Sequence, residues 1–289
     1  MLAPCATPLH IAAAPIVERS GFTIIGNTYG STQLRDRRVQ SFFFLQPLPD
    51  TWGASLAAFL KSRNARRVAI ATMQNPFTLE VRKNVIDNAG GAYQVVFDQQ
   101  YPGDIRDMTT LVNGMKSATP DAICALSYPT DGDLFGATCR EQGLSTATMV
   151  IMFGPNYPSF AQRLGSWSDG ILSLGIWSRN VRWPGAREFH EGFTRKVGTP
   201  PDDKDAVVVY ASAQVLGQAL VRAGTDKAAV RAAVRQGGFE TIIGPVSFGA
   251  DNVNTARVDG LTQLQNGINE LVWPEEARTA PFRPRASVS

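Results

Sequence analysis

The chain has 289 residues, which is enough for one large domain or two lobes. Hydrophobic residues make up 44% and charged residues 18%, a balance typical of a folded globular protein. The net charge of +3 comes from scattered basic residues, so composition predicts no nucleic acid as a partner. No apolar run approaches the roughly 18 residues of a membrane-spanning helix. The first basic side chain is Arg19, so no secretory signal peptide is visible.

Short apolar runs alternate with helical patterns through the first two thirds of the chain. The runs that predict strands are Gly21–Ile25, Arg67–Met73, Tyr93–Gln99, Asp121–Leu126, Thr148–Phe153 and Gly170–Ile176. Apolar residues at helical spacing predict helices at Trp52–Ser62, Thr78–Ala89, Ile105–Ser117 and Thr130–Gln142. Strand–helix alternation with nearly continuous apolar strands is typical of a parallel sheet that is covered on both faces. The sequence therefore predicts an α/β fold.

The last third changes character. Helices are expected at Ala186–Val197, Ala206–Ala223 and Asp226–Gly237. Val246–Phe248 and Gly260–Gln265 look like two strands joined by a polar loop, and Leu271–Trp273 looks like a third. The residues after Trp273 are rich in Pro and Arg, so we expect a frayed tail.

Patterns that would indicate catalysis or metal binding are missing. The two histidines, His10 and His190, have neither a nearby Ser-Gly elbow nor a His/Asp cluster. The sequence has neither a dinucleotide-binding glycine motif nor a phosphate-binding loop. We therefore expect no enzyme activity, no catalytic residues, no metal and no cofactor.

Aromatic, hydroxyl and amide side chains follow the predicted strands. They are Thr28, Tyr29, Ser31, Phe77, Tyr101, Ser127, Tyr128, Asn156 and Tyr157. Ligands of open parallel sheets bind beyond the carboxyl ends of the strands. Thr7, before Pro8, also suits a helix N-cap. Helix N-termini hold carboxylates and aromatic rings supply apolar walls, so the set predicts a pocket for a small organic acid with an apolar part.

Each of these residues, taken singly, is equally well explained as a turn or cap residue. For Tyr101, beside Pro102 and Gly103, the turn is the better interpretation.

The order of several segments resembles a known family. The segments are PCAT, AAAPIVERSGFTII, GNTYGST, FFFLQPLPDTWGASLAAFL, RRVAIATMQNPFTLEVRKNV, GDIRDMTTLVNGMKSATPDAICAL and CREQGL. In this order they resemble the type I periplasmic binding proteins, and look closest to the Leu/Ile/Val-binding-protein-like, branched-chain amino-acid-binding group of ABC transporter substrate-binding proteins. The resemblance runs from about Leu2 to about Leu271.

The resemblance implies a two-lobed fold with parallel sheets flanked by helices, in which hinge closure traps a ligand in the inter-lobe cleft. On this chain the first lobe would take residues 1–47 and 180–237, and the second lobe residues 48–179 and 238–275. Residues 276–289 would form a flexible tail. Family members have a signal peptide and further strand–helix units ahead of the first segment seen here, so we expect an N-terminally truncated chain with an incomplete first lobe.

The resemblance also implies ligand-binding residues, named here by the family motif that each matches. They are Thr7, Tyr29, Gly30, Ser31, Phe77, Ser127, Tyr128, Asn156 and Tyr157. In amino-acid-binding members a carboxylate stands where this chain has Asn156, and it holds the ammonium group of the ligand. Because an unpaired buried ammonium is costly, we expect a ligand other than a simple amino acid: an aromatic or aliphatic carboxylate, or an amide.

The function implied is that of a periplasmic solute-binding receptor of an ABC importer, which carries a small molecule to a membrane permease. A cytosolic or sensory ligand-binding regulator of the same fold is the alternative, and the lack of a visible signal peptide slightly favours it.

Overall fold

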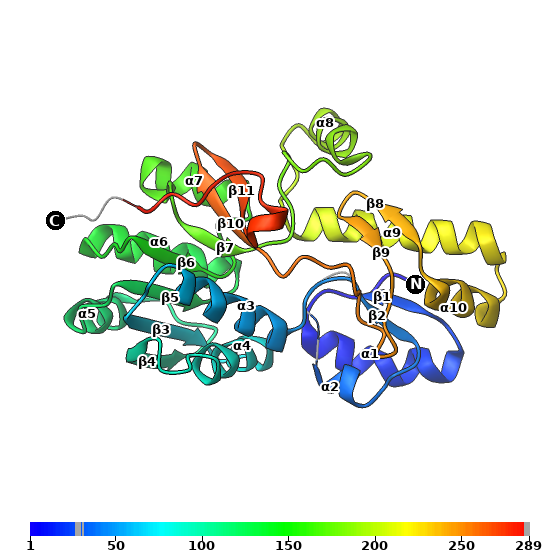
Figure 1. The fold of residues 1–289 in the computed structure, drawn as a ribbon, viewed down its shortest axis with the longest axis horizontal. Coiled ribbons are helices and arrows are strands. Elements are labelled where there is room, and N and C mark those ends of the chain that lie inside the picture. Colours follow the sequence, from blue (N-terminus) through cyan, green and yellow to red (C-terminus); the bar gives the residue numbers. More distant parts are fainter. Residues whose placement is uncertain (27–29, 31, 286–289) are drawn as a thin grey trace. The chain divides into compact units, whose positions relative to one another are not determined.

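The computed structural model describes residues 1–26, 30 and 32–285. The chain forms two compact units (Figure 1). Unit 1 holds Met1–Pro49 and Asn180–Val258, and unit 2 holds Asp50–Arg179 and Asp259–Ser289. Residues 238–258, expected in the second lobe, fall in unit 1 instead, because two short strands within them pack beside a long helix of that unit.

Unit 2 is built on a seven-stranded sheet of order β11-β10-β7-β6-β5-β3-β4 (Figure 1). Its strands are β3 (Arg67–Met73), β4 (Gln94–Tyr101), β5 (Ala122–Leu126), β6 (Thr148–Ile151), β7 (Leu172–Leu174), β10 (Leu261–Gln265) and β11 (Ile268–Trp273). The strands from β3 to β7 run parallel, and β10 and β11 are antiparallel. The predicted strand at Arg67–Met73 is confirmed at both ends.

Helices flank this sheet. They are α3 (Pro49–Ser62), α4 (Pro76–Asp87), α5 (Thr109–Ser117), α6 (Pro129–Gln142) and α7 (Pro158–Leu164), with short 3₁₀ turns at Gly165–Ser168 and Glu275–Ala277. Prolines open α4, α6 and α7, where the missing N–H of proline costs nothing. Met115 of α5, Phe135 of α6 and Phe160 of α7 are fully buried in one apolar core with the strands. Burial of these apolar faces holds the helices on the sheet.

Unit 1 combines two short pairs of strands with five helices among its described residues. Its elements are α1 (Thr7–Ser20), β1 (Ile24–Gly26), α2 (Thr32–Asp36), β2 (Phe42–Phe44), α8 (Ala186–Val197), α9 (Asp205–Ala223), α10 (Lys227–Gln236), β8 (Phe239–Thr241) and β9 (Gly244–Val246). β1 and β2 pair in parallel, and Leu2 bridges Ile25 on the other side of β1.

The strand expected near Val246 and the strand expected at Gly260–Gln265 fall in different units and do not pair with each other. β9 instead pairs with β8, and β10 pairs with β11 and β7 in unit 2. A two-residue turn, Ile242 and Ile243, returns the chain directly from β8 to β9, which begins at Gly244 with φ of 98°. Local hairpin closure therefore prevails over the longer connection.

The helix α9 is apolar enough and long enough to cross a membrane by length and composition alone. In unit 1 it packs against α10, β8 and β1, with Val207, Ala211 and Val215 buried. Packing therefore explains the apolar residues of its buried face, whereas Val209, Leu220 and Val221 are exposed.

The interpretation of the C-terminal residues as a frayed tail is wrong for the part up to Arg285. The guanidinium of Arg285 donates to the carbonyl oxygens of Trp167 and Asp169 at 2.9 and 2.6 Å, and it lies over the Trp167 ring. Gln263 donates to the carbonyl oxygen of Arg283 at 2.7 Å. These hydrogen bonds order residues that the composition alone marks as mobile.

The contact of α3 with α4 requires glycine at position 53. A Cβ atom there would lie 2.5 Å from the Cβ of Asn84 and 2.6 Å from the carbonyl oxygen of Val81. Gly53→Ala should therefore lower the free energy of unfolding by about 1–3 kcal/mol. Gly217→Ala in α9 is the matched control, because open space surrounds that position, and it should raise stability by about 0.5–1 kcal/mol. Urea denaturation measures both, and equal stability of the two variants would contradict the packing described.

Candidate functional site

Three aromatic rings gather where β3, β5 and β6 end in unit 2. β5 pairs in parallel with both neighbours, so the segments that follow the three strands meet at one edge of the sheet. Phe153 lies between the other two rings, with its centroid 6.1 Å from that of Phe77 and 6.3 Å from that of Tyr128. Phe77 and Phe153 are buried and Tyr128 is half-buried. We call Phe77, Tyr128 and Phe153 the aromatic group.

The sequence predicts Phe77 and Tyr128 as site residues, and the structure brings them together. Phe153 was missed because the predicted strand at Thr148–Phe153 included it, whereas β6 ends at Ile151.

Asn75 links two members of the aromatic group. It is the N-cap of α4, and its Oδ1 atom accepts from the backbone N–H of Phe77 at 3.0 Å. The same atom accepts from the hydroxyl of Tyr128 at 3.2 Å. Sequence reasoning missed Asn75, although an Asn directly before Pro76 is a typical helix start.

A buried carboxylate supports the backbone of Tyr128. Asp131 lies in the first turn of α6, and its Oδ1 atom accepts from the N–H of Tyr128 at 3.0 Å. Its Oδ2 atom accepts from the hydroxyl of Tyr101 at 2.6 Å. Burial raises the pKa of the Asp131 carboxyl, and the hydrogen bond from Tyr101 opposes this rise. Burial, together with the charge of Asp131, raises the pKa of Tyr101 as well. Tyr101 is thus a structural residue at the end of β4.

Asn156 is held by the neighbouring strand β7. Its side chain is 1% exposed, its Nδ2 atom donates to the carbonyl oxygen of Leu174 at 3.2 Å, and its Oδ1 atom accepts from the hydroxyl of Ser173. Tyr157 is the half-buried N-cap residue of α7. The roles of Asn156 and Tyr157 in ligand binding stay predictions.

Ser127 is buried where β5 ends. Its hydroxyl lies 3.5 Å from the carbonyl oxygens of Ala125 and Phe153, so it joins the ends of β5 and β6. A ligand contact by Ser127 stays a prediction.

Unit 1 contributes Thr7 and Gly30 to the predicted site residues. The expectation that Thr7 is the N-cap is wrong: Ala6, with φ of 84°, holds that position and Thr7 is the first helical residue. The Thr7 hydroxyl instead donates to the carbonyl oxygen of Gly30 at 3.0 Å. A Cβ atom at Gly30 would lie 2.1 Å from Cδ2 of Leu48, so a larger residue there would require the Leu48 side chain to shift. Thr28, Tyr29 and Ser31 lie outside the described residues.

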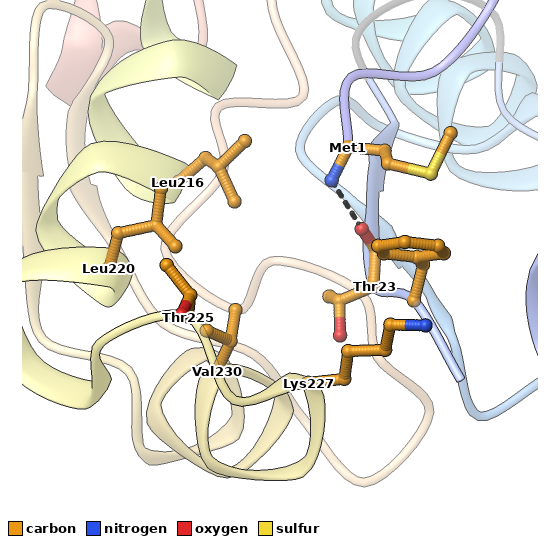
Figure 2. Close-up of a pocket in the computed structure, with 8 residues that line it drawn as sticks. Met1, Thr23, Leu216, Leu220, Thr225, Lys227 and Val230 are labelled. Atoms are coloured by element: carbon orange, nitrogen blue, oxygen red, sulfur yellow. Dashed lines mark hydrogen bonds between the residues drawn. The ribbon is translucent and has the colours of Figure 1, made fainter. Parts of the chain in front are cut away.

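A separate pocket of about 350 Å³ lies within unit 1 (Figure 2). It is lined by Met1, Phe22, Thr23, Leu216, Leu220, Thr225, Lys227 and Val230. Thr23 directly precedes β1, so the pocket lies at the amino end of this strand. Ligands of parallel sheets bind at the carboxyl ends, and we therefore keep this pocket apart from the candidate site.

The residues that the structure describes include no group of three His, Cys, Asp or Glu side chains that could hold a metal ion. At the edge occupied by the aromatic group, the side chains can bind a molecule by apolar contact and by hydrogen bonds.

Asp131 gives unit 2 a testable pH dependence. Because burial raises the pKa of its carboxyl above 3.8, the folded protein binds this proton more tightly than the unfolded chain. Its contribution to the free energy of unfolding therefore falls as pH rises from about 4 through the raised pKa, and it is constant above that value. Asp131→Asn should remove this fall, and urea denaturation of both proteins from about pH 4 to about pH 7 measures it.

Asp107 is the control of opposite sign, because its hydrogen bonds with Thr109 lower its pKa. Asp107→Asn should lessen the loss of stability toward acid pH. The account of Asp131 fails if Asp131→Asn steepens the fall in the free energy of unfolding between acid and neutral pH, or leaves that fall unchanged.

Known proteins share this fold over nearly the whole chain. The structure superposes on the branched-chain amino acid transporter substrate-binding protein LivJ of Streptococcus pneumoniae, solved in complex with isoleucine, with a TM-score of 0.84 and 19% identity over 94% of this chain and 79% of that one. A solute-binding protein of an ABC transporter from R. palustris, solved in complex with benzoate, gives a TM-score of 0.83 and 16% identity over 99% of this chain and 79% of that one. The expected type I periplasmic-binding-protein fold is confirmed.

The sequence comparisons agree. Leu/Ile/Val-binding protein homolog 7 of Brucella melitensis is 24% identical over 94% of this chain and 73% of its own length. These relatives are substrate-binding proteins and not enzymes, and family membership implies a periplasmic or extracellular location. Residues 1–267 match the family described as periplasmic binding protein. The chain therefore belongs to the periplasmic binding protein family.

Proposed function

We propose that this protein is the solute-binding receptor of an ABC importer, and that it binds a small carboxylate with an aromatic or aliphatic body. The aromatic group at the carboxyl ends of β3, β5 and β6 is the observation that carries the proposal. Three adjacent rings offer an apolar wall that suits a ring or a branched chain. The structural neighbours support this ligand class, since one was solved with benzoate and another with isoleucine.

The preference for an acid over an amino acid follows from position 156. The family's amino-acid-binding members have a carboxylate there, and this chain has Asn156, whose amide is engaged with β7. A neutral amide lends an ammonium group far less electrostatic stabilisation than a carboxylate does. A ligand without an ammonium group avoids this cost.

The remaining parts of the proposal rest on the resemblance to the family. Thr7, Tyr29, Gly30 and Ser31 of unit 1, and Ser127 and Tyr157 of unit 2, are proposed as ligand-contacting residues. The partner is a membrane permease and the location is the periplasm. Ligand binding favours the conformation that the permease recognises, which is a shift of population toward that state.

Calorimetry with benzoate, an aliphatic carboxylate and leucine tests the proposal. The wild-type protein should bind one of the two acids. Tyr128→Ala should weaken that binding by about 10-fold or more, because it removes one ring of the aromatic group and its hydroxyl contact with Asn75. Tyr210→Ala is the matched control, since Tyr210 is 45% exposed on α9 in unit 1 and should leave affinity unchanged.

Tight binding of leucine with no binding of either acid would rule out the proposed ligand class.

A further inference from the structure

The acceptor oxygens of the polar side chains beside the aromatic group are engaged within unit 2. Oδ1 of Asn75 accepts from the N–H of Phe77 and the hydroxyl of Tyr128. The two carboxylate oxygens of Asp131 accept from the N–H of Tyr128 and the hydroxyl of Tyr101. Asp131 is 6% exposed, so a ligand has little access to its charge.

Asn156 offers no accessible acceptor either. Its Oδ1 atom accepts from Ser173 and its Nδ2 atom donates to Leu174, so both ends of the amide are bound to β7. The side chain is 1% exposed. Asn75 Oδ1 already accepts two hydrogen bonds, and the oxygens of Asp131 and Asn156 are buried. An ammonium group brought to this edge would therefore find no accessible oxygen with a spare lone pair among these three side chains.

The side-chain nitrogen of Asn75, unlike its oxygen, is not engaged with the part of the protein that the structure describes. Its orientation is fixed, because only the oxygen can accept from the backbone N–H of Phe77 and a nitrogen there would place donor against donor. The NH₂ group is therefore held on the opposite side. Among the described residues, this nitrogen donates no hydrogen bond. Asn75 is half-buried, and its nitrogen is not among the buried atoms that lack a partner, so its donor is open to an incoming molecule.

We propose that Asn75 is a specificity-determining residue whose side-chain amide donates a hydrogen bond to a carboxylate oxygen of the ligand, beside Phe77 and Tyr128. This inference rests on the proposed function and refines it. The edge of unit 2 presents a donor, while the oxygens of these three side chains are engaged or buried, so it selects ligands by the acceptor oxygen they carry and disfavours an ammonium group. A donor aimed at a charged acceptor makes one of the stronger hydrogen bonds in proteins.

Asn75→Asp separates this role from the structural role of the same residue. Aspartate keeps an oxygen in place of Oδ1, so it caps α4 and accepts from Phe77 and Tyr128 as asparagine does. It replaces the NH₂ donor with a negatively charged oxygen of nearly the same size. Affinity for benzoate should fall by about 10-fold or more, while the melting temperature of the unliganded protein stays within about 2 °C of wild type.

Asp226→Asn provides the matched control. Asp226 is the N-cap of α10 in unit 1, and its side chain accepts from the N–H of Ala229 at 2.8 Å. The substitution exchanges aspartate for asparagine, the reverse of Asn75→Asp, at a cap that has no part in the proposed site, so affinity for benzoate should not change.

Asn75→Ser is a second test variant, because it keeps a capping oxygen and adds no charge. It should also weaken benzoate binding. It replaces Asn75→Asp as the test if the melting temperature of Asn75→Asp is lower than that of wild type.

A pair of ligands tests the selection directly. Leucine and 4-methylpentanoate share one carbon skeleton and differ by the α-ammonium group. Wild type should bind 4-methylpentanoate more tightly than leucine, and Asn75→Asp should shift the ratio of the two affinities toward leucine by about 10-fold or more. Calorimetry on the full chain measures both ligands against both proteins.

The outcomes distinguish this inference from the proposed function. Wild type that binds acids, together with Asn75→Asp and Asn75→Ser that bind them equally well, overturns the inference and leaves the proposed function standing. Wild type that prefers leucine over 4-methylpentanoate overturns the inference and the proposed ligand class together. Wild type that binds none of the probes overturns both proposals.

Discussion

Parallel pairing of β5 with β3 on one side and β6 on the other is the constraint on which the candidate site depends. The register aligns Val68 with Ala122 and Ala122 with Thr148, so the three strands finish at the same edge. All five residues of β5 are fully buried, and a strand covered on both faces must be apolar almost throughout. Polar and aromatic side chains with a function can therefore stand only in the segments that follow the strands. The aromatic group consists of such residues.

Hydrogen bonds between buried polar groups hold this edge in place. Asn75 and Asp131 fix Tyr128 at its hydroxyl and at its backbone, and Asn156 ties the segment after β6 to β7. Each of these polar groups has a protein partner, as buried polar groups require. The result is a rigid apolar wall with its oxygens engaged and one amide nitrogen open. Rigid sites lose less entropy when a ligand binds, so the same hydrogen bonds that stabilise unit 2 also favour recognition.

Sequence reasoning identified most of unit 2 and the family. Apolar runs bounded by turn residues located β3 at both ends, and the strand–helix order predicted the parallel sheet. The same reasoning did not reach the pairing of strands that are distant in the sequence. The partner of β10 is β7, about 90 residues earlier, and no local pattern encodes that choice. Arg285 is ordered by carbonyl oxygens near Trp167, which composition cannot reveal.

The candidate site was likewise predictable only where a local sequence pattern marks the residue. Phe77 and Tyr128 follow strands and stand out in the sequence, whereas Asn75 gains its meaning from a hydroxyl that lies 53 residues further along the chain. The engaged state of Asn156 likewise depends on β7 and could not be inferred from its neighbours.

A crystal structure of the protein grown with an aromatic carboxylate tests the central claim most directly. The account predicts that the ring of the ligand lies against Phe77, Tyr128 and Phe153, with one carboxylate oxygen within about 3 Å of the Nδ2 atom of Asn75. A ligand bound instead in the pocket lined by Leu216, Leu220 and Val230, with the aromatic group unoccupied, would contradict it.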